Sequence, residues 1–181
     1  VVPIFPSTLR LLARASDRPL NALLSQLFQR DPGGPPRGWR ELPIASRARR
    51  LMAFARWMLE QSGRPDRLPF IAHLCDYEQW VHTPSRPLPR VRSHPCPPGP
   101  LERCVLARLP GLELRTFPYD TLRLLSQLEV DDVKLHRTHL ILRRRNAWPA
   151  ITQPVTDLQR VLFEETDGSR TAGELIEALQ K

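Results

Sequence analysis

Seven prolines between residues 84 and 100 constrain this 181-residue chain most, because neither a helix nor a central strand can run through them. Closely spaced prolines favour an extended, polyproline-like connector. We therefore expect three parts: a helical domain over residues 1–83, a linker over 84–100 and a mixed domain over 101–181. Hydrophobic residues make up 41% of the chain, which is enough to form a real core.

Helical periodicity dominates the first part. Short helices are expected at residues 9–15 and 20–28, and Ser7–Thr8 would cap the first of them. The strongest pattern runs from Ile44 to Gln61, where apolar residues recur every three or four positions. Another helix is expected from Pro69 to Val81, because proline is favoured in the first turn of a helix.

The second part mixes strand and helix patterns. Two capping boxes, at Thr156 and Thr171, predict two helices separated by a tight turn at Asp167–Gly168. The predicted fold class is α+β, with an N-terminal helical bundle followed by a small mixed domain that has a short antiparallel sheet and a winged-helix-like helix pair. Strands are expected near 104–107, 112–117, 137–143 and 148–152, and a further helix over Tyr119–Leu128.

The net charge of +8 comes almost wholly from arginine, and it indicates acidic partners. Twelve arginines fall within residues 1–67, so a DNA-binding transcriptional regulator that uses this basic helical half is one alternative. Aromatic residues are not interleaved with these arginines as a base-stacking surface would require. The last helix presents Glu174 and Glu177, which do not suit a helix that reads bases. We therefore expect no nucleic acid partner.

An extended acidic peptide would suit a strand edge that ends in arginines and lies beside a helix. The alternative is a solvated edge whose charges merely prevent aggregation. A second surface, for a protein partner, is expected at Trp39, Trp57, Asp76, Trp80 and His82. The residues predicted to bind the peptide are Arg137, Leu140, Leu142, Arg143, Arg144, Arg145, Trp148, Ile151, Leu175 and Leu179.

Local signatures of catalysis are absent from the sequence, including a nucleophile elbow, a His-Glu-x-x-His motif and a dinucleotide-binding glycine pattern. Zinc ligands could come from His73, Cys75, His94, Cys96 and Cys104, but each His and Cys pair is split by one residue rather than two to four. We expect no cofactor in this chain. Three cysteines favour a reducing compartment, and no stretch of about twenty apolar residues exists, so a cytoplasmic location without membrane contact is expected.

Two stretches carry a resemblance to known proteins. They are LPFIAHLCDYEQW at Leu68–Trp80 and VLFEETDGSRTAGELIEAL at Val161–Leu179. With the order of the domains, they resemble the MbnC-type accessory subunits of methanobactin biosynthesis. The tail is also similar to leader-recognition elements of ribosomal peptide pathways. Those elements usually have three consecutive strands before the helices, whereas the helix at Tyr119–Leu128 is expected to interrupt the strands here.

The resemblance implies a heterodimer with an MbnB-like TIM-barrel iron oxygenase. That complex would bind an MbnA-like precursor peptide and use dioxygen to oxidise its cysteines to oxazolone and thioamide groups, which later chelate copper. Iron would lie in the partner, so the present chain would not be catalytic alone. Its implied role is to hold the leader peptide along a strand edge and to shape the active site of the partner.

Overall fold

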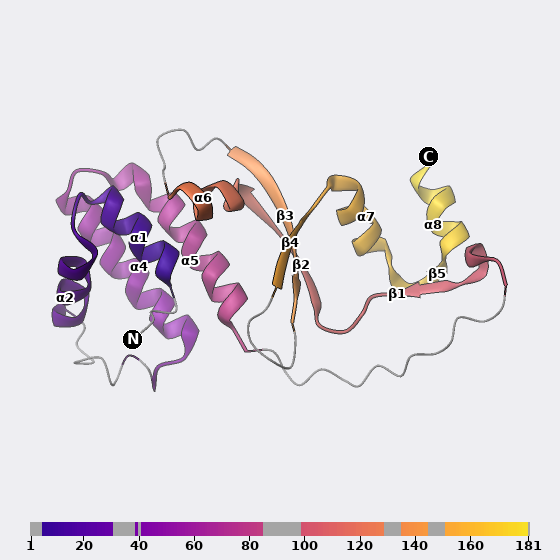
Figure 1. The fold of residues 1–181 in the computed structure, drawn as a ribbon, viewed down its shortest axis with the longest axis horizontal. Coiled ribbons are helices and arrows are strands. Elements are labelled where there is room, and N and C mark those ends of the chain that lie inside the picture. The colour runs from indigo at the N-terminus through magenta and orange to yellow at the C-terminus, as the bar shows by residue number, and fades with distance from the viewer. Residues whose placement is uncertain are drawn as a thin grey trace. The chain divides into compact units, whose positions relative to one another are not determined.

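The computed structural model describes residues 5–30, 39, 41–84, 99–128, 135–144 and 151–180 (Figure 1). Within these ranges the chain has seven α-helices, a three-stranded sheet and a two-stranded sheet. The fold is therefore α+β with helices at the N-terminal end, as the sequence predicted. None of the described helices is both long and apolar enough to cross a membrane.

The elements follow the chain in a simple order. They are α1 (Pro6–Ala15), α2 (Leu20–Arg30), α4 (Ile44–Gln61), the 3-10 turn η1 (Pro65–Arg67), α5 (Leu68–His82), the 3-10 turn η2 (Leu101–Arg103), β1 (Val105–Ala107), β2 (Leu112–Tyr119), α6 (Thr121–Gln127), β3 (Leu135–Arg143), β4 (Ile151–Val155), α7 (Asp157–Glu165), β5 (Asp167–Thr171) and α8 (Ala172–Leu179).

Two compact units divide the chain. The first contains residues 1–83 and 117–137, and the second contains 84–116 and 138–181. The sequence interpretation placed residues 117–137 in the mixed domain, whereas their described part belongs with the N-terminal helices. The predicted linker lies mostly outside the described residues, because only 84, 99 and 100 of it are described.

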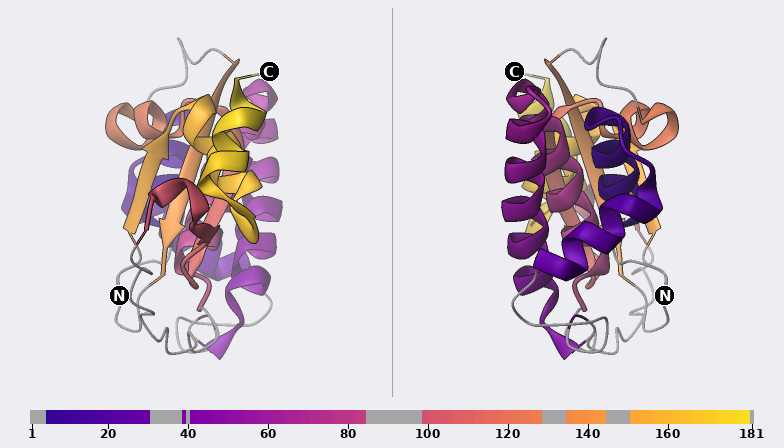
Figure 2. Two further views of the ribbon diagram at one scale, coloured as in Figure 1. Left: turned by 90° about the vertical axis from the view of Figure 1, so that its right-hand side faces the viewer. Right: turned by 90° about the vertical axis from the view of Figure 1, so that its left-hand side faces the viewer.

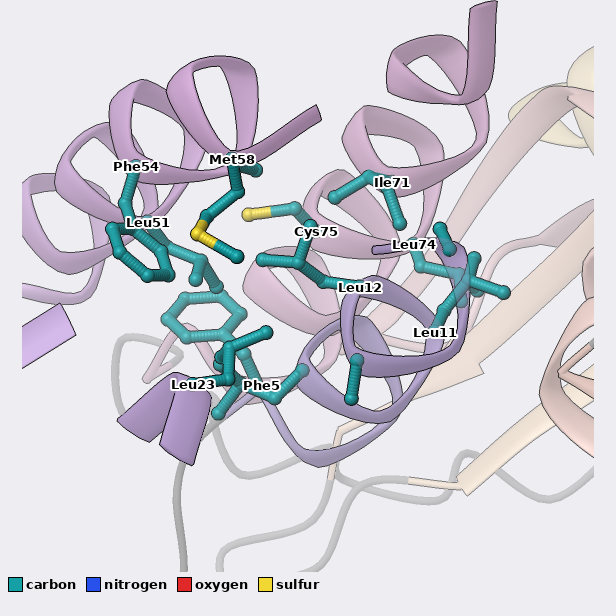
Figure 3. Close-up of a cluster of buried hydrophobic side chains, with 14 of the residues drawn as sticks. Phe5, Leu11, Leu12, Leu23, Leu51, Phe54, Met58, Ile71, Leu74 and Cys75 are labelled. Carbon is teal, nitrogen blue, oxygen red and sulfur yellow. The ribbon is translucent and has the colours of Figure 1, made fainter. Parts of the chain in front are cut away.

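The core of the first unit lies between α1, α4 and α5, which pack side by side (Figures 1 and 2). Figure 3 shows side chains from these helices converging, and Leu12, Leu51 and Leu74 are fully buried there. Leu23 of α2 joins the same cluster. The helix predicted from Ile44 to Gln61 has those bounds in the structure, because its apolar stripe faces this core.

Glu78 of α5 is a buried carboxylate that holds the first turn of α1. Its Oε1 accepts the N–H of Ser7 at 2.8 Å, and its Oε2 accepts the N–H and the hydroxyl of Thr8 at 3.0 and 2.7 Å. Helix α1 begins at Pro6 and has no cap from a neighbouring side chain, so Glu78 satisfies N–H groups that the helix leaves unbonded. The sequence predicted Ser7–Thr8 as the cap, but these residues are the donors.

Aromatic packing joins the end of β2 to the helices of the first unit. Phe117 and Tyr119, at the end of β2, have ring centroids 5.3 Å from the His73 ring of α5. The Trp80 ring lies 5.7 Å from Phe117. Nε2 of His73 lies 2.9 Å from the hydroxyl of Thr121, so the buried imidazole has a polar partner. This part of the chain is therefore bound to α5 by both packing and hydrogen bonding.

The three-stranded sheet has the order β2-β3-β4, so β3 is the central strand. Strands β3 and β4 are antiparallel, and their register runs from His139 opposite Val155 to Arg143 opposite Ile151. The outer strands β2 and β4 contain Pro118 and Pro154, which is consistent with the confinement of proline to edge strands. Each outer strand therefore lacks one backbone donor.

His139 connects three elements of the second unit. Its Nδ1 lies 2.8 Å from the Thr116 hydroxyl on β2, and its Nε2 lies 2.8 Å from Oδ1 of Asp157 at the start of α7. A Thr–His–Asp series has residue types found in catalytic triads. We interpret it as a structural brace, because the imidazole is buried and fixes β2, β3 and α7 against one another.

Replacing Glu78 with Ala should destabilise the first unit by about 2–4 kcal/mol, because three donors in and beside the first turn of α1 lose their acceptor. Urea unfolding followed by circular dichroism measures this loss. The matched control is Glu60→Ala, since Glu60 lies exposed on α4. Equal midpoints for the two variants would contradict the role given to Glu78.

Stability should fall as the pH drops from 6.5 towards 4, in part because of His73. Burial lowers the pKa of His73 to about 4, although Asp76 opposes the shift. The unfolded chain therefore binds a proton that the folded chain excludes in this window, and stability is lost on acidification. His73→Gln removes this group, so its free energy of unfolding should fall by about 2–3 kcal/mol less than that of the wild type between pH 6.5 and 4. Parallel pH profiles for the two proteins would refute the assignment.

Candidate peptide-binding surface

Residues 99–109 and 156–180 of the second unit form what we term the C-terminal lobe. It contains η2, β1, α7, β5 and α8 (Figure 1). Strands β1 and β5 are antiparallel, with Val105 opposite Thr171 and Ala107 opposite Asp167, and the register shifts between these pairs. The sequence predicted a tight turn where β5 lies. Gly168 has the expected positive φ of 91°, yet its neighbours pair with β1 as a strand.

Capping boxes start both helices of the lobe, as predicted. Thr156 Oγ1 accepts the N–H of Gln159 at 3.2 Å, and Gln159 Oε1 accepts the N–H of Thr156 at 2.9 Å. Thr171 and Glu174 form the same reciprocal pair at the start of α8. The bonds from Thr171 lower the pKa of Glu174. The local sequence thus fixes where each helix begins.

Close backbone contacts hold α8 and α7 against the chain around β1. The N–H of Ala172 donates to the carbonyl oxygen of Cys104 at 2.9 Å. Gly173 lies so near η2 that a Cβ there would come within 3.0 Å of the Glu102 carbonyl oxygen. Arg108 donates through Nε to the Thr166 carbonyl oxygen at 2.9 Å. These bonds hold the elements of the lobe against one another, although few of its side chains are buried.

The apolar side chains of the lobe are mostly exposed. Among its described residues Leu175 is the one buried hydrophobic side chain, with 2% exposure. A helix pair and a ribbon with so little core leave large apolar groups in water, which is typical of a docking surface. The exposed large residues of the lobe are Leu101, Val105, Leu106, Leu109, Leu158 and Ile176.

Strand β1 has an open, apolar edge. Among the described residues its one neighbouring strand is β5, and all three residues of β1 are exposed. Val105 and Leu106 are 56% and 38% exposed. Native proteins usually protect such edges with charges, proline or a covering segment. The sequence Val-Leu-Ala has neither a charge nor proline, so this edge is a candidate for pairing with an added strand.

The predicted site at β3 needs correction. β3 has strands on both sides, so no peptide can be added along it. Leu140 and Leu142 are fully buried and Leu175 is 2% exposed, because these side chains form cores. Arg144 is also buried, and its guanidinium pairs with both carboxylate oxygens of Glu113 at 2.5 and 3.1 Å. These four residues support the fold rather than presenting a surface to a peptide.

The other predicted peptide contacts are scattered. Arg137 and Arg143 are exposed on β3, and Ile151 is 44% exposed on the outer strand β4. Leu179, in the last turn of α8, is half-buried. Arg145 and Trp148 lie outside the described residues. Sequence reasoning missed β1 as a candidate edge, although the run of apolar residues at 104–107 was the available signal.

Of the five residues predicted for a partner interface, one is exposed and lines a groove, and the other four are partly or fully buried. Trp80 is buried against Phe117, so it is a core residue and this prediction is corrected. Trp39 and Trp57 are half-buried against the core of the first unit. His82 is half-buried, and burial lowers its pKa. Asp76 is exposed on α5 and lines a surface groove.

Residues considered as zinc ligands have other surroundings where they are described. Burial raises the pKa of Cys75 to about 12, with Glu78 and Asp76 adding to the effect, so the metal-binding thiolate is disfavoured. His73 bonds to Thr121 as noted above. No group of three or more His, Cys, Asp or Glu side chains is arranged to hold a metal in the described part of the chain. His94 and Cys96 fall outside it.

No family model, curated protein or solved structure matches this chain. The resemblance to MbnC-type subunits and the winged-helix comparison therefore remain predictions.

Leu175→Ala should loosen the lobe without affecting the first unit, because it removes the one buried apolar side chain described there. Leucine-to-alanine changes in cores cost about 2–5 kcal/mol. Limited proteolysis should then cleave within α7–α8 at least tenfold faster. Ile176→Ala is the matched control, since Ile176 is 51% exposed. If both variants resist protease like the wild type, the lobe has another source of stability.

Proposed function

We propose that this chain is a non-catalytic accessory subunit that holds a precursor peptide in extended form for a peptide-modifying enzyme. The single observation that supports this proposal is the exposed apolar strand β1, which has one neighbouring strand among the described residues and lies in a lobe with almost no core. A peptide strand added to β1 would bond to its backbone, while alternate side chains would reach either face of the β1–β5 ribbon.

The length of β1 limits what backbone bonding can contribute. Three residues offer two or three ladder bonds, each with a net value of about 0.5–1.5 kcal/mol. Additional affinity would have to come from burying Leu101, Leu106 and Leu109, at about 25 cal/mol per Å² of apolar surface. The peptide should therefore carry apolar side chains near the segment that pairs with β1.

The resemblance to MbnC-type subunits supports a specific partner. In this proposal an MbnB-like TIM-barrel iron oxygenase holds the iron and oxidises cysteines of an MbnA-like precursor, and the present chain binds the leader segment. The complex would then make oxazolone and thioamide groups of a copper-chelating product. This chain alone would turn over no peptide, and it would restore activity when mixed with the barrel subunit.

Leu106→Glu should weaken peptide binding at least tenfold, because a charge replaces an apolar contact at the open edge. The proposal implies a short cysteine-containing reading frame beside the gene, and the probe is the fluorescein-labelled peptide that this frame encodes. Fluorescence anisotropy measures its affinity. Leu122→Glu is the matched control, since Leu122 is 40% exposed on α6 and Leu106 is 38% exposed.

Equal affinities of the two variants would refute peptide binding at β1. Loss of affinity in both variants, with unchanged circular dichroism, would place the peptide elsewhere on the protein. The DNA-binding alternative predicts an affinity for duplex DNA that falls steeply with salt, as released counterions require. Titrations at two salt concentrations test it, and an absence of binding at moderate salt removes it.

A further inference from the structure

A surface groove of about 390 Å³ lies between α4 and α5 in the first unit. It is separate from the β1 edge in sequence, and no residue of the C-terminal lobe lines it. Its walls are the surfaces of two neighbouring helices, α4 and α5. The backbone N–H and C=O groups of these walls are already bonded within the helices. A strand could not be added here, whereas side chains of another helix could pack into it.

Four of the nine residues that line the groove have small side chains, Ala48, Ala53, Ala72 and Cys75. Ala48 and Ala53 of α4 and Ala72 of α5 line the groove together with Met52 of α4. Small residues at a helix surface permit another helix to approach within the 8–10 Å typical of packed helices. Met52 is half-buried, and its flexible thioether can adapt to apolar side chains of different shapes.

Two arginines give the α4 side of the groove a positive rim. Arg49 and Arg56 are seven residues apart, which places them two turns and about 10.5 Å apart along one face of α4. Both are exposed. Arg49 makes one long bond, at 3.4 Å to Ser46 Oγ, and Arg56 has no ion pair or hydrogen-bonded partner in the described ranges. Arg47 differs, since it donates to the Leu42 carbonyl oxygen at 2.8 Å and lies outside the groove.

We infer that this groove docks an acidic amphipathic helix of the partner subunit. Two carboxylates seven residues apart on that helix would face Arg49 and Arg56, and apolar side chains between them would cover Ala53 and Met52. Asp76 and Gln79 on the α5 side favour a polar or basic residue on the opposite flank of the same helix. The inference rests on the proposed function for the identity of the partner, but its residues are independent of the peptide surface.

A charge-swap measurement tests the inference. The probe is a synthetic, fluorescein-labelled helical peptide of about 20 residues, long enough to be partly helical, with two Glu seven residues apart and leucines between them. The double variant Arg49→Glu/Arg56→Glu should bind it at least tenfold more weakly than the wild type. The same variant should recover binding to a peptide in which Lys replaces both Glu.

The matched control changes the same charge elsewhere. Arg10 and Arg18 are exposed outside the groove, so Arg10→Glu/Arg18→Glu should leave binding of the acidic peptide within twofold of the wild type. Ala53→Phe adds a test without a charge change, because a phenyl ring at this exposed position would fill the groove and should also weaken binding. Equal effects of the two charge-reversed variants, or no effect of Ala53→Phe, would overturn the inference.

The complex itself separates this inference from the proposed function. Arg49→Glu/Arg56→Glu should abolish co-purification with the barrel enzyme and keep the affinity for the precursor peptide, whereas Leu106→Glu should do the opposite. Sedimentation velocity of the chain alone excludes the other occupant. A dimer that Ala53→Phe converts to a monomer would show that a second copy covers the groove, and the inference would be wrong.

Discussion

The bond network around Glu78 is the constraint on which the first unit depends. A carboxylate that is 3% exposed must have its oxygens satisfied, and it finds all its donors in the first turn of α1, about 70 residues earlier in the chain. That requirement fixes the position of α1 on α5. Other faces of α5 then receive α4, through the leucine core, and Phe117, through His73 and Trp80. α5 is thus the element around which the unit assembles.

The two units use apolar residues in opposite ways. The first buries a continuous cluster that includes Leu12, Leu51 and Leu74, and its groove lies on the outside of that rigid support. The C-terminal lobe buries Leu175 and exposes most of its other large apolar residues that the structure describes. The proposed contact with an enzyme partner would use the well-packed helical face, and the proposed contact with a peptide would use the exposed strand of the lobe.

The sequence predicted a helix or strand well where neighbouring residues determine where it begins and ends. The helix at Ile44–Gln61 and the boxes at Thr156 and Thr171 follow from spacing within a few residues. Contacts between segments that are distant in the sequence could not be predicted from local patterns. Nothing near Glu78 indicates that it binds the start of α1. The polar stretch Asp167–Thr171 lacks the alternating pattern that predicts a strand, and it is a strand because it pairs with β1. The central position of β3 likewise depends on its pairing with β2, from which α6 separates it in the chain.

The pairing of β1 with β5 joins segments about sixty residues apart, since Ala107 lies opposite Asp167. Closing so long a loop costs chain entropy, as does the contact of Thr8 with Glu78, which spans 70 residues. What differs is the order of synthesis: β5 and α8 come last in the chain, so the lobe can be completed only after α1, α4 and α5 have been made. On the ribosome, the groove between α4 and α5 would therefore be made before the edge of β1 is complete, so in the proposed complex docking of the partner precedes binding of the peptide.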